Sequence, residues 1–301
     1  MQQSQFRGTG VALVTPFQDG QVDFEALGHL IEHTIDGGVD YIVSLGTTGE
    51  AVTLSTKECK EVIDFTINVI AGRVPIVLGL FGGNNTAMII ERFRSYDFDN
   101  VDAILSSSPN YNKPTQEGIF QHYMAVQKES PKPIIIYNVP SRTSSNVDAA
   151  TTLRLAYASN QFIGIKDASG NLTQAAQIAK NKPESFALLS GDDPSALPFI
   201  ACGGDGVISV IANVFPRQFS DLICAALDND FAMAQKIHLE LLDIHPWLYV
   251  DGNPAGVKAA LSMIGIGNLE VRLPLVPIQK ENYLGLRKEM EKLLLHEQVK
   301  V

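Results

Sequence analysis

The chain has 301 residues, 45% of them hydrophobic, which is enough for one large domain or for a domain with an appendage. Its 33 acidic and 23 basic residues give a formal net charge of -10, which opposes nonspecific binding to nucleic acid. The cysteines, Cys59, Cys202 and Cys224, lack the paired spacing of a disulfide framework or a zinc cluster. The N-terminal residues lack a signal-peptide pattern, and no apolar run approaches the roughly 20 residues of a membrane span. We therefore expect a cytoplasmic protein that binds neither nucleic acid nor membranes.

Eight short runs rich in valine, isoleucine and leucine recur along the chain. They lack the alternation of half-exposed strands, so each is predicted to be a parallel strand that is buried on both faces. The runs are GVALVTP (10–16), YIVSLG (41–46), PIVLGL (75–80), VDAILSS (101–107), PIIIYN (133–138), FIGIKD (162–167), FALLSGD (186–192) and GVISV (206–210).

Segments with helical periodicity lie between these runs. The first helix is predicted to end at Gly37 and Gly38, and the second to begin at Ser55, which forms a capping-box pattern with Glu58. The repeat of strand and helix predicts an α/β protein with a (β/α)8 TIM barrel. A doubly wound open sheet is the main alternative, but it usually has fewer strands.

The strand signals stop after about Val210. Four helical segments are predicted after that point, at residues 216–228, 231–245, 254–264 and 279–296. The first completes the eighth strand-helix unit of the barrel. We therefore predict a catalytic barrel over residues 1–228 and a C-terminal helical domain over residues 229–301.

Polar residues follow several of the predicted strands. Barrel enzymes place their active sites at the C-terminal ends of the strands, so these residues are the first candidates for a site. GTTGE (46–50) follows the second run, SPNYNKPT (108–115) the fourth, YNVPSRT (137–143) overlaps the end of the fifth, and Lys166 lies near the end of the sixth. One lysine, one arginine and several hydroxyl groups are predicted to converge.

Lys166 can be explained in two ways. It can form an ion pair, for example with Asp167 or Asp192, or it can act as a nucleophile that forms an imine with a carbonyl substrate. Imine formation requires a neutral amine, and an apolar interior favours the neutral form of a lysine in general. Position alone favours the ion pair, whereas the apolar run before Lys166 is typical of the nucleophile.

Four other positions have both a catalytic and a structural explanation. Tyr137 can transfer protons beside an imine or be a packed aromatic residue. Thr47 and Thr48 can bind a carboxylate or start the next segment, and Arg142 can clamp a carboxylate or lie on the surface without a ligand. A metal site at His29 and His33 is not favoured, because their spacing on a helix lacks the glutamate of the zinc-protease pattern.

Seven motifs in this order resemble the dihydrodipicolinate synthase family of pyruvate-dependent class I aldolases and lyases. They are GTTGE, SPNYNKPTQEG, IIIYNVPSRT, IGIKDASGNLTQ, LLSGDD, GVISV and RLPLVP. The resemblance covers nearly the whole chain. It implies that Lys166 forms a Schiff base with pyruvate, that Tyr137 donates and accepts the protons, and that Thr48 and the backbone of Ile208 bind the pyruvate carboxylate.

The resemblance also implies a site that is shared between subunits. Thr47 would link Tyr137 to Tyr111, which in the family reaches in from the neighbouring subunit. We therefore expect a homotetramer built from two dimers. The covalent imine on Lys166 implies that neither a cofactor nor a metal ion is needed.

The resemblance names L-aspartate 4-semialdehyde as the second substrate, with Arg142 holding its carboxylate. The product would enter the synthesis of diaminopimelate and lysine. One alternative is a related Schiff-base lyase for N-acetylneuraminate or a 2-keto-3-deoxy sugar acid. Another is a noncatalytic barrel that acts as a binding or regulatory subunit.

The sequence departs from the family pattern at one other site. Family members that lysine inhibits have a separate lysine site made of histidines, a glutamate and a tyrosine. The corresponding positions here are Thr56, Cys59, Met88 and Asn110, and only Asn84 is kept.

We predict that free L-lysine inhibits this protein weakly or not at all. Each buried polar group of the ligand that loses its partner costs about 1 to 3 kcal/mol, so several losses remove most of the affinity. The measurement is the steady-state rate over a range of lysine concentrations. Strong inhibition by submillimolar lysine would contradict this prediction.

Overall fold

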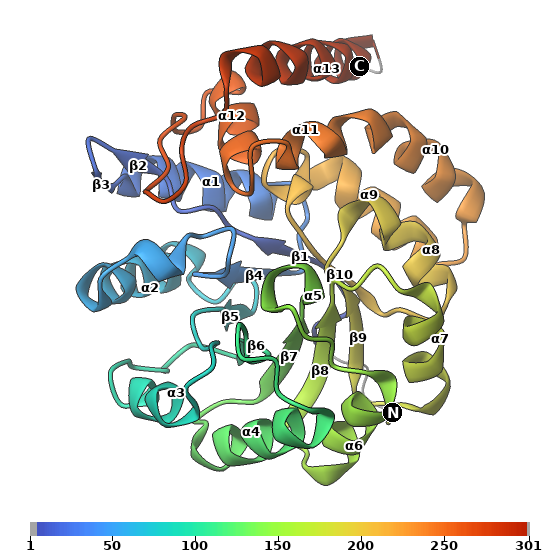
Figure 1. Cartoon of the computed structure of the whole chain (residues 1–301). Helices are drawn as coiled ribbons and strands as arrows, with labels where there is room; N and C mark the ends of the chain where they lie inside the picture. The colour runs from blue at the N-terminus through green and yellow to red at the C-terminus, as the bar shows by residue number, and fades with distance from the viewer. Residues whose placement is uncertain (1–4, 300–301) are drawn as a thin grey trace.

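Eight parallel strands close into a barrel in the structure, a computed structural model that describes residues 5–299 (Figure 1). The strands are β1 (Gly8–Ala12), β4 (Tyr41–Ser44), β5 (Ile76–Leu78), β6 (Ala103–Ser107), β7 (Ile134–Asn138), β8 (Phe162–Asp167), β9 (Ala187–Ser190) and β10 (Gly206–Ser209). The first strand, β1, pairs with both β10 and β4, and this closes the ring. All eight predicted strands are confirmed, and the closure excludes an open sheet.

A ring of helices surrounds the barrel (Figure 1). Asp23 caps the first helix, which ends at Gly37, and Ser55 and Glu58 form the predicted capping box of the second. The ring consists of α1 (Phe24–Asp36), α2 (Thr56–Ile70), α3 (Thr86–Phe93), α4 (Gln116–Glu129), α6 (Ala149–Ala158), α7 (Leu172–Asn181), α8 (Ala196–Ala201) and α9 (Pro216–Leu227). A short helix, α5 (Pro140–Thr143), follows β7, and a hairpin of β2 (Phe17–Gln18) and β3 (Gln21–Val22) follows β1.

Apolar side chains form two separate cores. The larger core lies between the strands and the helices, and the smaller core fills the inside of the barrel. Val43, Leu105, Leu189 and Ile208 belong to the inner core, and each is nearly fully buried. The barrel is therefore a packed structure, and polar groups have room only at its ends.

Four further helices follow the barrel, namely α10 (Phe231–Leu241), α11 (His245–Tyr249), α12 (Ala255–Met263) and α13 (Lys280–Val299). The helix predicted over residues 231–245 was too long. It ends at Leu241, and a 3-10 turn, η4 (Leu242–Ile244), leads into α11. Pro246 lies in the first turn of α11 and lacks the N–H that a continuous helix needs there, which explains the break.

The predicted boundary between residues 228 and 229 falls in the connection from α9 to α10. The division into two domains stays a prediction. Within residues 5–299, no helix combines the length and the apolar character needed to cross a membrane.

Candidate active site

A cavity of about 540 Å³ lies at the C-terminal ends of the barrel strands. Five predicted site residues line it, namely Thr47, Thr48, Tyr137, Arg142 and Lys166. They come from the segments after β4 and β7 and from the ends of β7 and β8, so the closure of the barrel brings them together. This is the end of the barrel that the position of active sites in this fold predicts.

Lys166 and Tyr137 lie side by side inside the barrel. Lys166 on β8 pairs in register with Tyr137 on β7, and the lysine Nζ lies 4.6 Å from the centroid of the tyrosine ring. Both side chains are buried, with exposed fractions of 5% and 8%. The register therefore places a primary amine beside a tyrosine ring whose hydroxyl group can exchange protons.

The ion-pair alternative for Lys166 is not formed. Asp167 faces away from the cavity, where its carboxylate accepts hydrogen bonds from Asn138 Nδ2 at 3.1 Å and from Gln174 Nε2 at 2.9 Å. Asp192 accepts a hydrogen bond from Ser195 Oγ at 2.5 Å. Among the described residues, Lys166 has no salt bridge.

The charge on Lys166 affects one buried carboxyl group, that of Asp193. Burial raises the pKa of Asp193 to about 6. Hydrogen bonds from the N–H groups of Ile211 and Val210 and the charge on Lys166 lower this pKa, but their effect is smaller than that of burial. The two N–H groups lie 2.8 and 2.9 Å from Asp193 Oδ2. Asp193 is thus held in place by the segment that follows β10.

The Thr48 hydroxyl is prepared to donate a hydrogen bond. Thr48 is buried, and its Oγ1 accepts a hydrogen bond from Asn253 Nδ2 at 2.9 Å. A hydroxyl group has one hydrogen to donate, and here that hydrogen is free for another acceptor because the oxygen already accepts. A carboxylate in the cavity fits this role. Thr47 is more exposed and also lines the cavity.

Arg142 lies on the short helix α5 at the rim of the cavity. Its side chain is exposed, and in the described part of the chain its guanidinium forms no salt bridge. A guanidinium group offers paired N–H donors that match a carboxylate. Arg142 is therefore able to bind an anionic group that enters the cavity.

Two predicted site residues do not line the cavity. Tyr111 is 87% exposed, and Ile208 is buried in the barrel interior. Between residues 5 and 299, no hydrogen bond joins Thr47 to Tyr137 or to Tyr111. The roles of Tyr111 and of the Ile208 backbone stay predictions.

The sequence prediction missed the contribution of the C-terminal segment. His245, Tyr249 and Asn253 line the cavity together with residues of the barrel. Burial lowers the pKa of His245 to about 4, and the charge of His238 adds to this effect, so the ring is neutral near pH 7. The NPAG motif at 253–256 predicts only the start of a helix, because no local pattern shows the hydrogen bond between Asn253 and Thr48.

The comparison with known families decides what this arrangement is. The model of the dihydrodipicolinate synthetase family matches residues 5–293. The chain belongs to this family. Membership agrees with the closed barrel.

Individual relatives of this family cover almost the whole chain. A 4-hydroxy-tetrahydrodipicolinate synthase of Parabacteroides distasonis is 47% identical over 288 residues, which are 95% of this chain and 97% of the relative. A dihydrodipicolinate synthase of Acinetobacter baumannii, solved in complex with pyruvate, is 38% identical with a TM-score of 0.91 and covers 95% of this chain and 98% of that one. A structure described as the first monomeric dihydrodipicolinate synthase variant is 34% identical with a TM-score of 0.93 and covers 96% and 97%.

The positions that correspond to the family's lysine site are also described. Cys59 is buried, and burial raises the pKa of its thiol. Thr56, Met88 and Asn110 are exposed, and none of them carries a charge. The prediction of weak or absent inhibition by lysine is not tested by these positions, but they offer few partners for an ammonium group.

Gly191 leaves the space that the Lys166 side chain occupies. A Cβ atom at Gly191 would lie 2.9 Å from Lys166 Cε and 2.7 Å from Ala168 Cβ. Both distances are shorter than ordinary contacts between carbon atoms, so the lysine would have to move.

We predict that Gly191→Ala lowers the rate of imine formation at Lys166 by roughly 100-fold, because a displacement of about 1 Å at a reacting group has an effect of this size. The rate is measured by trapping the adduct with borohydride at successive times. The control is Gly28→Ala on α1, where a new Cβ atom meets only the Phe65 ring, at 3.4 and 3.7 Å. An unchanged rate in Gly191→Ala would show that Lys166 does not need this space.

Proposed function

We propose that the protein is a 4-hydroxy-tetrahydrodipicolinate synthase, a lyase that condenses pyruvate with L-aspartate 4-semialdehyde. The observation that carries the proposal is the pair of Lys166 and Tyr137, in register at a cavity that Thr48 and Arg142 also line. The names of the relatives support the same reaction. The alternative of a sugar-acid lyase finds no support in those names.

The first half of the proposed reaction forms an imine. The neutral amine of Lys166 attacks the carbonyl carbon of pyruvate, and the Tyr137 phenol moves protons between the two groups until water leaves. The pyruvate carboxylate accepts hydrogen bonds from Thr48 and from the backbone at Ile208. The imine then loses a proton from the methyl group and becomes an enamine.

The second half forms the carbon-carbon bond. The enamine carbon attacks the aldehyde carbon of L-aspartate 4-semialdehyde, whose carboxylate is held by Arg142. The amino group of the semialdehyde then attacks the imine carbon, closes the ring and releases Lys166. No external cofactor is part of this sequence, because the imine itself takes up the electrons of the broken C–H bond.

The proposed product supplies diaminopimelate and lysine synthesis. We propose that the reaction takes place in the cytoplasm. The three cysteines Cys59, Cys202 and Cys224 support this, because all are free thiols, which persist in a reducing compartment.

The proposed function predicts rapid consumption of L-aspartate 4-semialdehyde that depends on pyruvate. Lys166→Ala should lower kcat by a factor on the order of 1,000 or more and abolish the borohydride-trapped adduct, because the nucleophile is gone. Lys166→Arg keeps the charge without a nucleophilic amine and serves as the control. A wild-type protein that forms the adduct but does not consume the semialdehyde would mean that the second substrate is a different aldehyde.

Arg142→Ala tests the binding of the second substrate. We expect KM for the semialdehyde to rise roughly 10- to 100-fold, because a charged hydrogen bond contributes about 1.5 to 3 kcal/mol. Formation of the pyruvate adduct should remain unchanged. Loss of the adduct in this variant would instead place Arg142 at the pyruvate site.

We also propose a homotetramer in which Tyr111 completes the site of a neighbouring copy. The 87% exposure of Tyr111 supports this, because a tyrosine on a projecting surface is available to a second chain. Family membership alone does not decide the assembly, since one relative is described as monomeric. We expect sedimentation to give a tetramer, and Tyr111→Phe to lower kcat without changing the assembly. A monomer with full activity would contradict both parts.

A further inference from the structure

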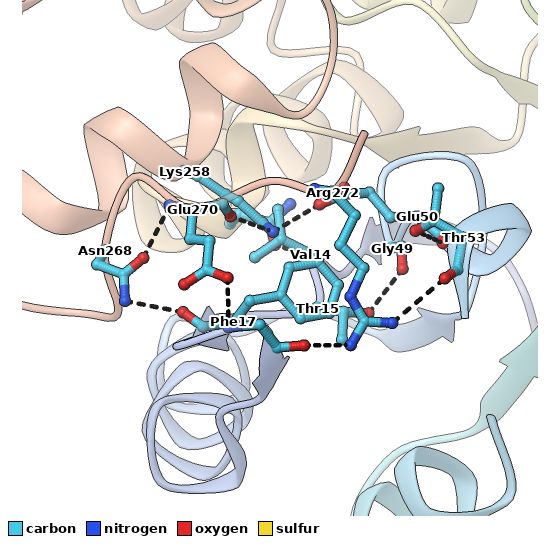
Figure 2. A network of polar contacts seen from close by, with 12 residues as sticks. Val14, Thr15, Phe17, Gly49, Glu50, Thr53, Lys258, Asn268, Glu270 and Arg272 are labelled. Carbon is cyan, nitrogen blue, oxygen red and sulfur yellow. Dashed lines mark hydrogen bonds and ion pairs between the residues drawn. The ribbon is translucent and has the colours of Figure 1, made fainter. Parts of the chain in front are cut away.

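A buried ion pair joins the GTTGE loop to the C-terminal segment (Figure 2). Lys258 Nζ on α12 lies 2.5 Å from Glu50 Oε1, and the two side chains are only 2% and 1% exposed. Removing two charges from water is costly unless each also has other polar partners. The reaction described above makes no use of either residue.

Both charges have such partners. Glu50 Oε2 accepts a hydrogen bond from the N–H of Arg272 at 2.9 Å, and Lys258 Nζ donates to the carbonyl of Glu270 at 2.8 Å. The lysine Nζ also lies 4.1 Å from the centroid of the Phe17 ring. Each member of the pair therefore has a second polar partner, and Figure 2 shows these residues around it.

Glu50 belongs to the loop that holds the threonines, and its backbone closes a turn of that loop. Its N–H donates to the carbonyl of Thr47 at 3.1 Å, and its φ of 53° lies in the left-handed region. Leu45, at the other end of the loop, has a φ of 57°. Residues other than glycine keep this conformation only where the surroundings hold them in it.

The same C-terminal segment reaches the loop at a second point. Asn253, five residues before Lys258, donates its hydrogen bond to the Thr48 hydroxyl at 2.9 Å. On the opposite side, Thr15 Oγ1 donates to the carbonyl of Gly49 at 2.7 Å. The orientation of Thr47 and Thr48 thus depends on contacts from outside the loop.

Stability alone does not account for a charged pair at this place. A buried ion pair is often no more stabilising than a well-packed apolar pair of the same size. Burial lowers the pKa of Lys258 to about 8, even though the neighbouring carboxylate of Glu50 favours its charge. The fold keeps this charge at an energetic cost, and in return each carboxylate oxygen of Glu50 binds a defined atom of the C-terminal segment.

We propose that Glu50 and Lys258 are positioning residues that hold the Thr47–Thr48 turn in the geometry that binds the pyruvate carboxylate. Through them, the C-terminal segment takes part in the reaction although it provides no reacting group. The proposal rests on the proposed function, because it requires pyruvate to bind at these threonines.

The test compares Glu50→Gln, Lys258→Met and the double variant below the Tm of each protein. In each single variant we expect KM for pyruvate to rise at least about tenfold, because one buried group loses its partner and the Thr47–Thr48 turn shifts. We expect a smaller change in kcat at saturating pyruvate. The double variant should be less impaired than the sum of the single variants, because it leaves no unpaired charge.

Lys182→Met is the matched control. Lys182 Nζ lies 2.9 Å from Asp205 Oδ2, with side-chain exposures of 11% and 28%, and the pair connects segments that precede β9 and β10 at the opposite end of the barrel. Its loss should lower Tm and leave KM for pyruvate unchanged.

One outcome overturns the proposal, and a different one contradicts the proposed function on which it rests. Folded single variants with a lowered Tm and an unchanged KM for pyruvate would show a structural role only and overturn it. If Lys258→Met does not fold, the nearly isosteric Glu50→Gln and the double variant still give the comparison. A wild-type protein that forms no borohydride-trapped pyruvate adduct would contradict the proposed function instead.

Discussion

The register of the closed barrel decides which side chains of this protein reach the cavity. Successive residues of a strand point to opposite faces, so Lys166 faces the inside and Asp167 faces the helices, where Asn138 and Gln174 bind its carboxylate. A shift of β8 by one residue would exchange the two and place an acid beside Tyr137. The pairing of β1 with both β4 and β10 closes the ring, so the sheet has no edge strand. A shift of β8 would therefore break its pairing with a strand on each side. The chemistry of the site depends on this constraint.

Most acidic groups near the cavity already have partners of their own. Asp193 accepts two backbone N–H groups, Asp192 accepts the Ser195 hydroxyl, and Glu50 pairs with Lys258. These bonds give the acids partners other than Lys166, in agreement with the absence of a salt bridge to it among the described residues. The lysine amine, the threonine hydroxyls and the arginine keep hydrogen-bonding capacity, and so does Nδ1 of His245. A site with this balance suits a substrate that carries a carbonyl and a carboxylate.

The apolar runs predicted all eight strands, because a strand buried on both faces leaves a continuous local pattern in the sequence. Lys166 and Tyr137 were predicted for a related reason, since each is a polar residue at the end of such a run. Asn253 was missed, because its bond to Thr48 joins residues that are 205 positions apart and no local pattern shows it. Lys258 lies within a fully buried stretch of α12. Like Lys166, it is a charged residue in an otherwise apolar run of the sequence. A single chain does not place Tyr111 at the cavity, so its role depends on the assembly.

The C-terminal segment is more than an addition to a complete barrel. A barrel alone supplies Lys166 and Tyr137, but the turn with Thr48 is a loop whose left-handed residues need support from outside. That support comes from Asn253 and Lys258, which lie on one continuous segment and contact the loop at two points. A boundary near residue 228 therefore separates two parts of the chain without separating two functions. Because the strands position Lys166 and Tyr137 and the C-terminal segment binds the Thr48 hydroxyl, the geometry of the cavity requires the two parts to be docked in one arrangement.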